Sequence, residues 1–137
     1  MRLIVSAFKV GASQTENAIA TGILINSVKE FTLDMVQGCY AGVQEVALQL
    51  TGFTDIEHLH RTAANLCEWF GQSCVYYSID NIGSLLHADG RHETIGAERE
   101  YPAEMVHSGL FRSVYQNYTV YSDGSAIAAK HTLKAAA

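Results

Sequence analysis

The alternation of apolar and polar residues divides the first third of the chain into a strand and a helix. An apolar run from Leu3 to Phe8, bounded by charged residues, predicts a buried strand. Ser13, followed three residues later by Glu16, has the spacing of a capping box, in which the two residues satisfy free N–H groups at a helix start. The pattern therefore predicts a helix from there to about Lys29.

A β-hairpin is predicted next. Two segments rich in β-forming residues, 31–40 and 43–50, flank Ala41 and Gly42, and glycine at the second position of a tight turn supplies the positive φ that hairpins need. Because side chains alternate along a strand, the second segment has an apolar face and an opposite face. The apolar face carries Val46, Leu48 and Leu50, and the opposite one carries Glu45, Ala47 and Gln49.

The clearest helical pattern follows at residues 54–71. Thr54 to Glu57 has the form of a second capping box, and apolar residues then recur at helical spacing until Gly71. Residues 73–79 predict a further strand, and residues 84–88 extend the sheet after a turn at 80–83. Residues 114–121 have the composition of a last strand.

The order strand, helix, strand, strand, helix, strand is typical of an α+β fold, the ferredoxin-like split βαβ two-layer sandwich, with both helices on one sheet face. Val36, Tyr40 and Ala47 fall on the other face, so we expect a partner subunit to cover it. Residues 1–121 are expected to form a single domain. Residues 122–137, mostly small, are expected to be a terminal tail that is disordered, an alanine-rich helix or an artificial extension.

Composition and net charge exclude several classes of protein. A chain of 137 residues that is 48% hydrophobic suits one globular domain. Nine basic and fourteen acidic residues give a net charge of −5, the wrong sign for binding nucleic acid. Three cysteines cannot all pair, no leader of signal-peptide form precedes the first strand, and no apolar run reaches the ~18 residues of a membrane span. We therefore expect a soluble, cytoplasmic protein.

Common cofactor and metal chemistry finds little support. No glycine-rich phosphate-binding motif is present. His58 and His60 face different directions on a helix, and Cys67 and Cys74 are separated by six residues, outside the short spacings of structural zinc sites. We therefore expect no metal and no cofactor. Residues 98–100 (Glu-Arg-Glu) form a charge run that is typical of a solvated face and remain secondary candidates for a site.

Tyr40 and Glu45 are the more promising pair. One tight turn places a phenol and a carboxylate on neighbouring strands at the end of a hairpin, with Cys39 the cysteine next to them. From the residues alone, an exposed cross-strand hydrogen bond is the favoured interpretation of this pair by about two to one, since such pairs are common.

Several short segments occur in an order that resembles a known family. They are Val5-Ser6-Ala7-Phe8, Gly38-Cys39-Tyr40, Ala63-Ala64-Asn65-Leu66-Cys67-Glu68-Trp69, Gln72-Ser73-Cys74-Val75-Tyr76-Tyr77, Leu85 to Gly90, and Ala97-Glu98-Arg99. In this order they resemble the bacteriophage S-adenosylmethionine-degrading enzymes, lyases that were formerly called hydrolases. The resemblance covers about residues 3–105.

The resemblance implies a fold similar to the trimeric nitrogen-regulatory (PII-like) proteins, with active sites between subunits of a homotrimer. It implies fission of S-adenosylmethionine into 5'-methylthioadenosine and L-homoserine lactone without metal or cofactor, and a role in depleting the methyl donor of host restriction systems. In the family a tyrosine ending the second strand and a glutamate in the third carry the site, which correspond to Tyr40 and Glu45. The hairpin loop is shorter here than in the family.

For substrate binding we expect the first-strand residues Ser6, Ala7 and Phe8, together with Gly38 and Cys39 beside the hairpin. Two alternatives remain open at this stage. A trimeric sensor could bind an adenine nucleotide in the same cleft without catalysis, because fold does not fix function. A lyase could also act on a modified substrate such as adenylylated S-adenosylmethionine.

Overall fold

The computed structural model describes residues 1–40 and 42–129. Within them, eight strands form a closed antiparallel barrel in the order β1-β3-β2-β7-β8-β6-β5-β4, and β4 pairs again with β1. The strands are β1 (Arg2–Val5), β2 (Thr32–Tyr40), β3 (Val43–Thr51), β4 (Cys74–Ile79), β5 (Ile82–His87), β6 (His92–Tyr101), β7 (Tyr118–Val120) and β8 (Ala126–Ala129). The helices are α1 (Gln14–Ser27), α2 (Ile56–Trp69), α3 (Ala103–Val106) and α4 (Gly109–Val114).

The predicted order of elements is confirmed from β1 to β4. The capping box of α1 is also confirmed, because the Ser13 hydroxyl accepts from the Glu16 N–H at 3.1 Å and the Glu16 carboxylate accepts from the Ser13 N–H at 3.3 Å. The start of α2 differs by one residue from the predicted box. Its N-cap is Asp55, whose carboxylate accepts from the N–H of His58 at 2.7 Å.

The predicted fold class is wrong. The chain does not form an open ferredoxin-like, PII-like sandwich, because β5, β6, β8 and β7 continue the sheet from β4 back to β2 and close it into a barrel. The face that was expected to need a partner subunit is therefore covered by the chain itself. Val36 and Ala47 belong to a buried cluster with Ile127 of β8. Closure also removes the open edges of the sheet.

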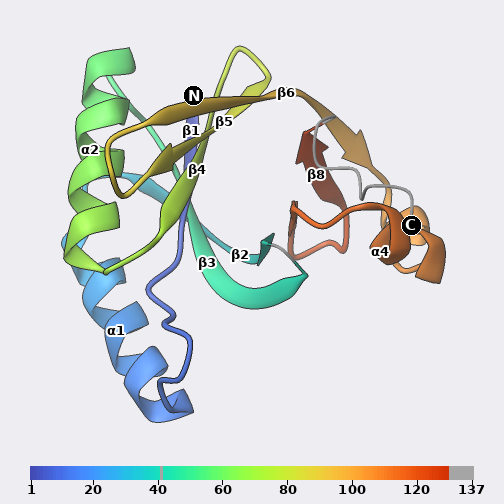
Figure 1. The fold of residues 1–137 in the computed structure, drawn as a ribbon, viewed down its shortest axis with the longest axis horizontal. Coiled ribbons are helices and arrows are strands. Elements are labelled where there is room, and N and C mark those ends of the chain that lie inside the picture. Colours follow the sequence, from blue (N-terminus) through green and yellow to red (C-terminus); the bar gives the residue numbers. More distant parts are fainter. Residues whose placement is uncertain (41, 130–137) are drawn as a thin grey trace.

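Helices pack apolar side chains against two outer sides of the barrel. Helices α1 and α2 cover one outer side of it, on the left of Figure 1, through a core that joins Leu24 and Leu59 to Leu3 and Leu48. Helix α4 lies on the opposite side with β8. There the short helices α3 and α4 bury apolar side chains against β2 and β7, including Cys39.

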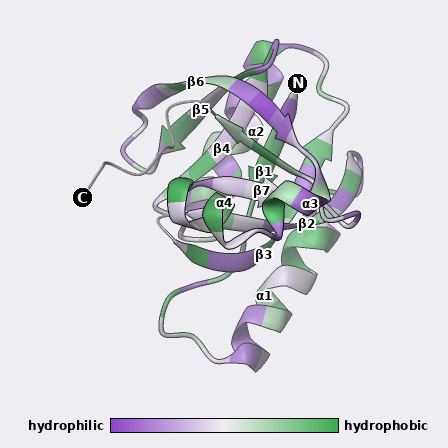
Figure 2. Ribbon diagram, turned by 90° about the vertical axis from the view of Figure 1, so that its right-hand side faces the viewer, coloured by the Kyte–Doolittle hydropathy of each residue, from purple (hydrophilic) through white to green (hydrophobic). Residues whose placement is uncertain are grey.

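The C-terminal third departs most from the sequence-based expectation. Strand β6 was not predicted, because its residues are largely polar and exposed, and Figure 2 shows much of it in purple. Residues 114–121 are not one strand, since Val114 ends α4 and only Tyr118–Val120 forms β7. Residues 126–129, expected in a tail, form the buried strand β8, whereas residues 130–137 of that expected tail lie outside the described residues.

Tight turns join neighbouring strands. Asp80 and Asn81 have φ of 52° and 62° and connect β4 to β5, which is the backbone of a type I′ hairpin turn. Gly42, with φ of 81°, occupies the predicted hairpin turn between β2 and β3, where Ala41 lies outside the described residues. None of the helices in the described part of the chain is long and apolar enough to cross a membrane.

Candidate active site

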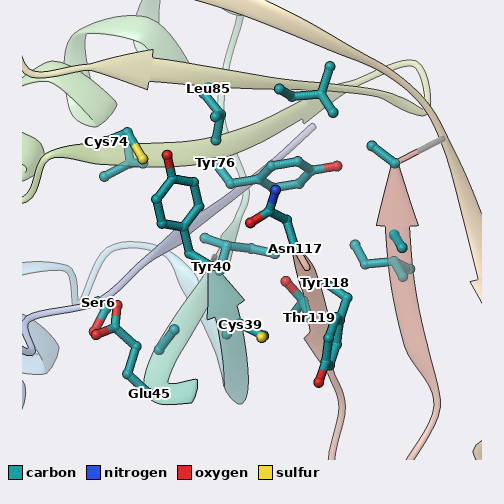
Figure 3. A pocket seen from close by; sticks show the side chains of 18 of the residues that line it. Ser6, Cys39, Tyr40, Glu45, Cys74, Tyr76, Leu85, Asn117, Tyr118 and Thr119 are labelled. Carbon is teal, nitrogen blue, oxygen red and sulfur yellow. The ribbon is translucent and has the colours of Figure 1, made fainter. Parts of the chain in front are cut away.

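A cavity of about 130 Å³ opens at one end of the barrel, where β1 and β2 end and β3, β4 and β7 begin. Figure 3 shows the side chains that surround it. Because strand residues alternate between the two faces, every second residue of each strand points inward. The inward pairs at this end are Gly38 and Tyr40, Glu45 and Ala47, Cys74 and Tyr76, and Asn117 and Thr119.

Glu45 is the single charged side chain among the described residues that line the cavity. It is paired across the ladder with Gly38, which has no side chain, and a Cβ at Gly38 would lie 3.6 Å from the Ala47 Cβ atom. Partial burial raises the pKa of Glu45 above its ordinary value, and interaction with the Ser6 hydroxyl partly offsets this. The site therefore presents one half-buried carboxylate that attracts a cation.

Ser6 connects the end of β1 to the wall of the cavity. Its hydroxyl donates to the Val46 carbonyl at 2.9 Å and accepts from the Phe8 N–H at 3.0 Å. The Ser6 hydroxyl has one proton, so it can donate to the Val46 carbonyl or to the Glu45 carboxylate, but not to both. Burial has the larger influence on the pKa of Glu45. The end of β1 thus sets the position of the carboxylate.

Tyr40 and Cys74 face each other across the cavity. Figure 3 shows the Tyr40 hydroxyl directed at the Cys74 sulfur. The proximity of Cys74, followed by burial and the hydrogen bond between the two groups, raises the pKa of Tyr40. Burial raises the pKa of Cys74, with smaller contributions from the negative charges of Glu45 and Glu93, while hydrogen bonds from Tyr40 and Ser73 lower it. Both groups are therefore protonated at neutral pH.

A buried polar network forms the floor of the cavity. Tyr76, which lines the cavity, donates its hydroxyl to the Glu98 carboxylate, and Ser78 donates to the same carboxylate at 2.6 Å. Behind them Arg2 donates to the Tyr121 hydroxyl at 2.7 Å. Burial and then the bond to Glu98 raise the pKa of Tyr76, so the phenol stays a donor. The network joins residues of β1, β4 and β6.

The structure brings together most of the residues singled out from the sequence. Cavity-lining positions are held by Ser6, Gly38, Cys39, Tyr40 and Glu45. Ala7 and Phe8 do not line the cavity: Ala7 packs in the core beneath the helices, and the Phe8 carbonyl accepts from the Gln72 amide at 3.0 Å. Whether these residues bind substrate stays a prediction.

Cys39 and the 98–100 charge run differ from expectation. The Cys39 side chain is buried among residues of α3 and α4, and its thiol donates to the Gln116 carbonyl at 3.4 Å, so the cysteine whose thiol faces the cavity is Cys74. Glu98 is not solvated, because its side chain is only 4% exposed beneath the cavity floor. Arg99 and Glu100 are exposed.

Sequence reasoning missed Cys74, Tyr76, Asn117 and Thr119 as cavity residues. A signal existed for the first two, since they occupy alternate positions of a predicted strand. Only the closure of the barrel shows that this strand faces Tyr40 and Glu45. In the described ranges, no three His, Cys, Asp or Glu side chains gather where they could hold a metal ion.

A cavity with one carboxylate, neutral hydroxyl and thiol groups and apolar walls has the chemistry that suits a small cationic molecule. A model of the S-adenosylmethionine lyase family matches residues 3–130. The chain belongs to that family and is an S-adenosylmethionine lyase. The match confirms the resemblance seen in the sequence and extends it beyond residue 105. No curated protein matches the chain.

Proposed function

We propose that the enzyme splits S-adenosylmethionine into 5'-methylthioadenosine and L-homoserine lactone. An oxygen of the substrate's own carboxylate attacks the γ-carbon, the bond from that carbon to sulfur breaks, and the electron pair stays on sulfur. The sulfonium leaves as a neutral thioether, so no proton has to move and no water is consumed. The observation that carries this proposal is that Glu45 is the single charged group among the described cavity-lining residues.

Glu45 acts as an anion and not as a base in this scheme. The substrate has an α-ammonium and a sulfonium, and a half-buried carboxylate attracts both more strongly than an exposed one does. If Glu45 contacts the ammonium, the substrate's carboxylate is left free to turn toward the γ-carbon. The enzyme then contributes mainly by selecting this folded conformer. A well-positioned intramolecular nucleophile can reach an effective concentration on the order of 10⁵ M or more.

Tyr40 supplies the second contact in our proposal. Its hydroxyl faces the cavity from the strand next to Glu45, and a neutral phenol can donate a hydrogen bond to the substrate's carboxylate without neutralising the nucleophile. Such a bond orients the carboxylate oxygen for attack. The adenosine is proposed to occupy the apolar part of the cavity beside Ser6, Gly38 and Cys39, where Leu85 and Ile127 also form the wall.

Of the two alternatives, a sensor without catalysis is disfavoured because the chain belongs to a family of lyases. A lyase that prefers adenylylated S-adenosylmethionine remains the second candidate for the physiological substrate. A competition assay with equal amounts of the two substrates distinguishes them, because kcat/KM fixes the ratio of their consumption.

We also propose that the enzyme is a homotrimer in the host bacterial cytoplasm. Its role there is to deplete the methyl donor of restriction systems. The trimer rests on the family resemblance, because the sheet face that suggested it from the sequence is covered within the chain. Light scattering tests it directly: a monomeric mass at micromolar concentration with full activity would contradict it.

Product identification is the central test of the reaction. Purified protein is incubated with S-adenosylmethionine, and the amino-acid product is followed by NMR from the earliest time point. We expect homoserine lactone first and homoserine later, as the lactone ring opens spontaneously. Homoserine without preceding lactone would contradict intramolecular attack.

A further inference from the structure

The Tyr40 ring stands at an open position of the site. Tyr40 is the last residue of β2, next to the hairpin turn, and is 45% exposed. A phenol with this freedom loses rotamer entropy when it is fixed for catalysis. Something in the cavity has to hold its hydroxyl if it is to orient the substrate.

Cys74 is the group toward which that hydroxyl points. It begins β4, on the far side of β1 and β3 from Tyr40 in the sheet order, and the curvature of the barrel brings the two side chains face to face. Both line the same cavity, and a hydrogen bond joins them. The contact therefore connects two walls of the site.

The other two cysteines are placed differently. Cys39 and Cys67 are buried, and their thiols donate to the Gln116 and Gln72 carbonyls at 3.4 and 3.2 Å. Cys74 is the partly exposed one of the three, and its thiol meets a side chain of the site.

We propose that Cys74 is a positioning residue that holds the Tyr40 hydroxyl over the cavity through a thiol–phenol hydrogen bond. This inference rests on the proposed role of Tyr40. Without substrate, the Tyr40 O–H donates to the Cys74 sulfur. When the substrate's carboxylate takes over the phenol proton, the thiol S–H donates to the phenol oxygen in turn and keeps it in place. Burial raises the pKa of Cys74, which keeps the thiol protonated and able to donate at neutral pH.

A double-mutant cycle tests this coupling. The values of kcat and KM are measured for the wild type, Tyr40→Phe, Cys74→Ala, Cys74→Ser and the double variant Tyr40→Phe/Cys74→Ala. We expect Cys74→Ala to lower kcat by about 3- to 10-fold, the range that corresponds to one hydrogen bond. Cys74→Ser keeps a donor of similar size and is expected to stay within about 3-fold of the wild type.

Measuring Cys74→Ala in the Tyr40→Phe background separates a positioning role of Cys74 from a general effect on structure. In the Tyr40→Phe enzyme there is no hydroxyl to hold, so adding Cys74→Ala is expected to change kcat by less than about 2-fold. An equal loss from Cys74→Ala in both backgrounds overturns the inference while leaving the proposed role of Tyr40 intact. Full activity of Tyr40→Phe overturns both.

Thiol labelling tests the placement without any substitution. Iodoacetamide is expected to modify one cysteine of the native wild-type protein, Cys74, and to react faster as pH rises because the thiolate is the nucleophile. Saturating 5'-methylthioadenosine is expected to slow this modification at least 5-fold, and Cys74→Ser should abolish it. Labelling of Cys74 at an unchanged rate with bound 5'-methylthioadenosine would show that its thiol does not face the substrate and would refute the inference.

Discussion

The hydroxyl of Tyr76 on β4 donates a hydrogen bond to the buried carboxylate of Glu98 on β6, over the strand that lies between them. Gly83 on the intervening strand β5 makes this contact possible, because the Tyr76 ring lies directly over it. A Cβ at Gly83 would stand 2.8 Å from the Tyr76 Cζ atom and closer still to the hydroxyl oxygen. The floor of the candidate active-site cavity thus depends on a residue without a side chain.

We expect Gly83→Ala to lower the free energy of unfolding by about 1–3 kcal/mol, since overpacking displaces the rigid ring and breaks its bond to Glu98. Gly22→Ala is the control, because Gly22 is an exposed helical glycine with open space around it and alanine there should stabilise by about 0.5–1 kcal/mol. Urea unfolding measures both. Equal stability of Gly83→Ala and the wild type would contradict the placement of Tyr76.

Glu45→Gln is expected to lower kcat/KM by about 10²-fold or more, because the amide keeps the shape and removes the charge that is proposed to face the cationic substrate. The same change should leave the fold as stable as the wild type or more stable, since partial burial makes the ionised carboxylate unfavourable. Glu57→Gln, at an 88% exposed side chain on α2, is the control for the activity measurement. Near-normal turnover of Glu45→Gln would remove Glu45 from the mechanism and make Glu68 and Glu98 the next residues to test.

The pH profile should report the same carboxylate. Burial raises the pKa of Glu45, and the proposed mechanism needs its ionised form, so kcat/KM should fall as pH drops through a pKa above the ordinary value for glutamate. The acid limb of kcat should lie at lower pH, because the bound cation favours the carboxylate. Steady-state kinetics from about pH 4 to about pH 8 cover this titration. They would show the acid limb of kcat/KM and the acid limb of kcat. Coincident limbs would mean that the substrate does not face Glu45.

Isotope labelling separates lyase from hydrolase. In water enriched in heavy oxygen, the first lactone should carry no label, because both of its oxygens come from the substrate's carboxylate. Homoserine formed later should gain label in its carboxyl group, whereas hydrolysis would label the side-chain hydroxyl. Mass spectrometry of fragments from the earliest samples makes the distinction. Label in the γ-hydroxyl at that stage would contradict the lyase mechanism but not the choice of substrate.

His60 should make the fold sensitive to acid. In the described part of the chain its Nε2 has no hydrogen-bond partner, and its ring lies 4.6 Å from that of His92 and 5.2 Å from that of Tyr77. Burial, and then the charge of His92, lower the pKa of His60 below its unfolded value of about 6.5. The unfolded chain therefore binds the proton more readily, and the free energy of unfolding should decrease as pH falls below that value.

Urea unfolding at several pH values measures this effect, with His60→Gln expected to show a flatter dependence and the exposed His107→Gln to behave like the wild type. An unchanged slope in His60→Gln would assign the acid sensitivity to other groups.

Elements with local signals were predictable from the amino-acid sequence. Ser13 and Glu16 define the start of α1 through bonds three residues apart, and the alternation in residues 43–50 separates Glu45 from Leu48. The proximity of Tyr40 and Glu45 likewise follows from one hairpin. Membership of the lyase family also came from the sequence, because the ordered segments are themselves sequence features.

The closure of the sheet into a barrel could not be predicted from local patterns and is seen in the three-dimensional structure alone. Strand β6 is polar and exposed, and the small residues of β8 have no periodic pattern, so neither contains a local signal, and their place is set by pairing with strands distant in sequence. That closure buries Glu98 under Tyr76 and brings Cys74 opposite Tyr40. Such contacts depend on which residues the barrel brings to one interior, and hydrophobic periodicity along the chain does not contain that information.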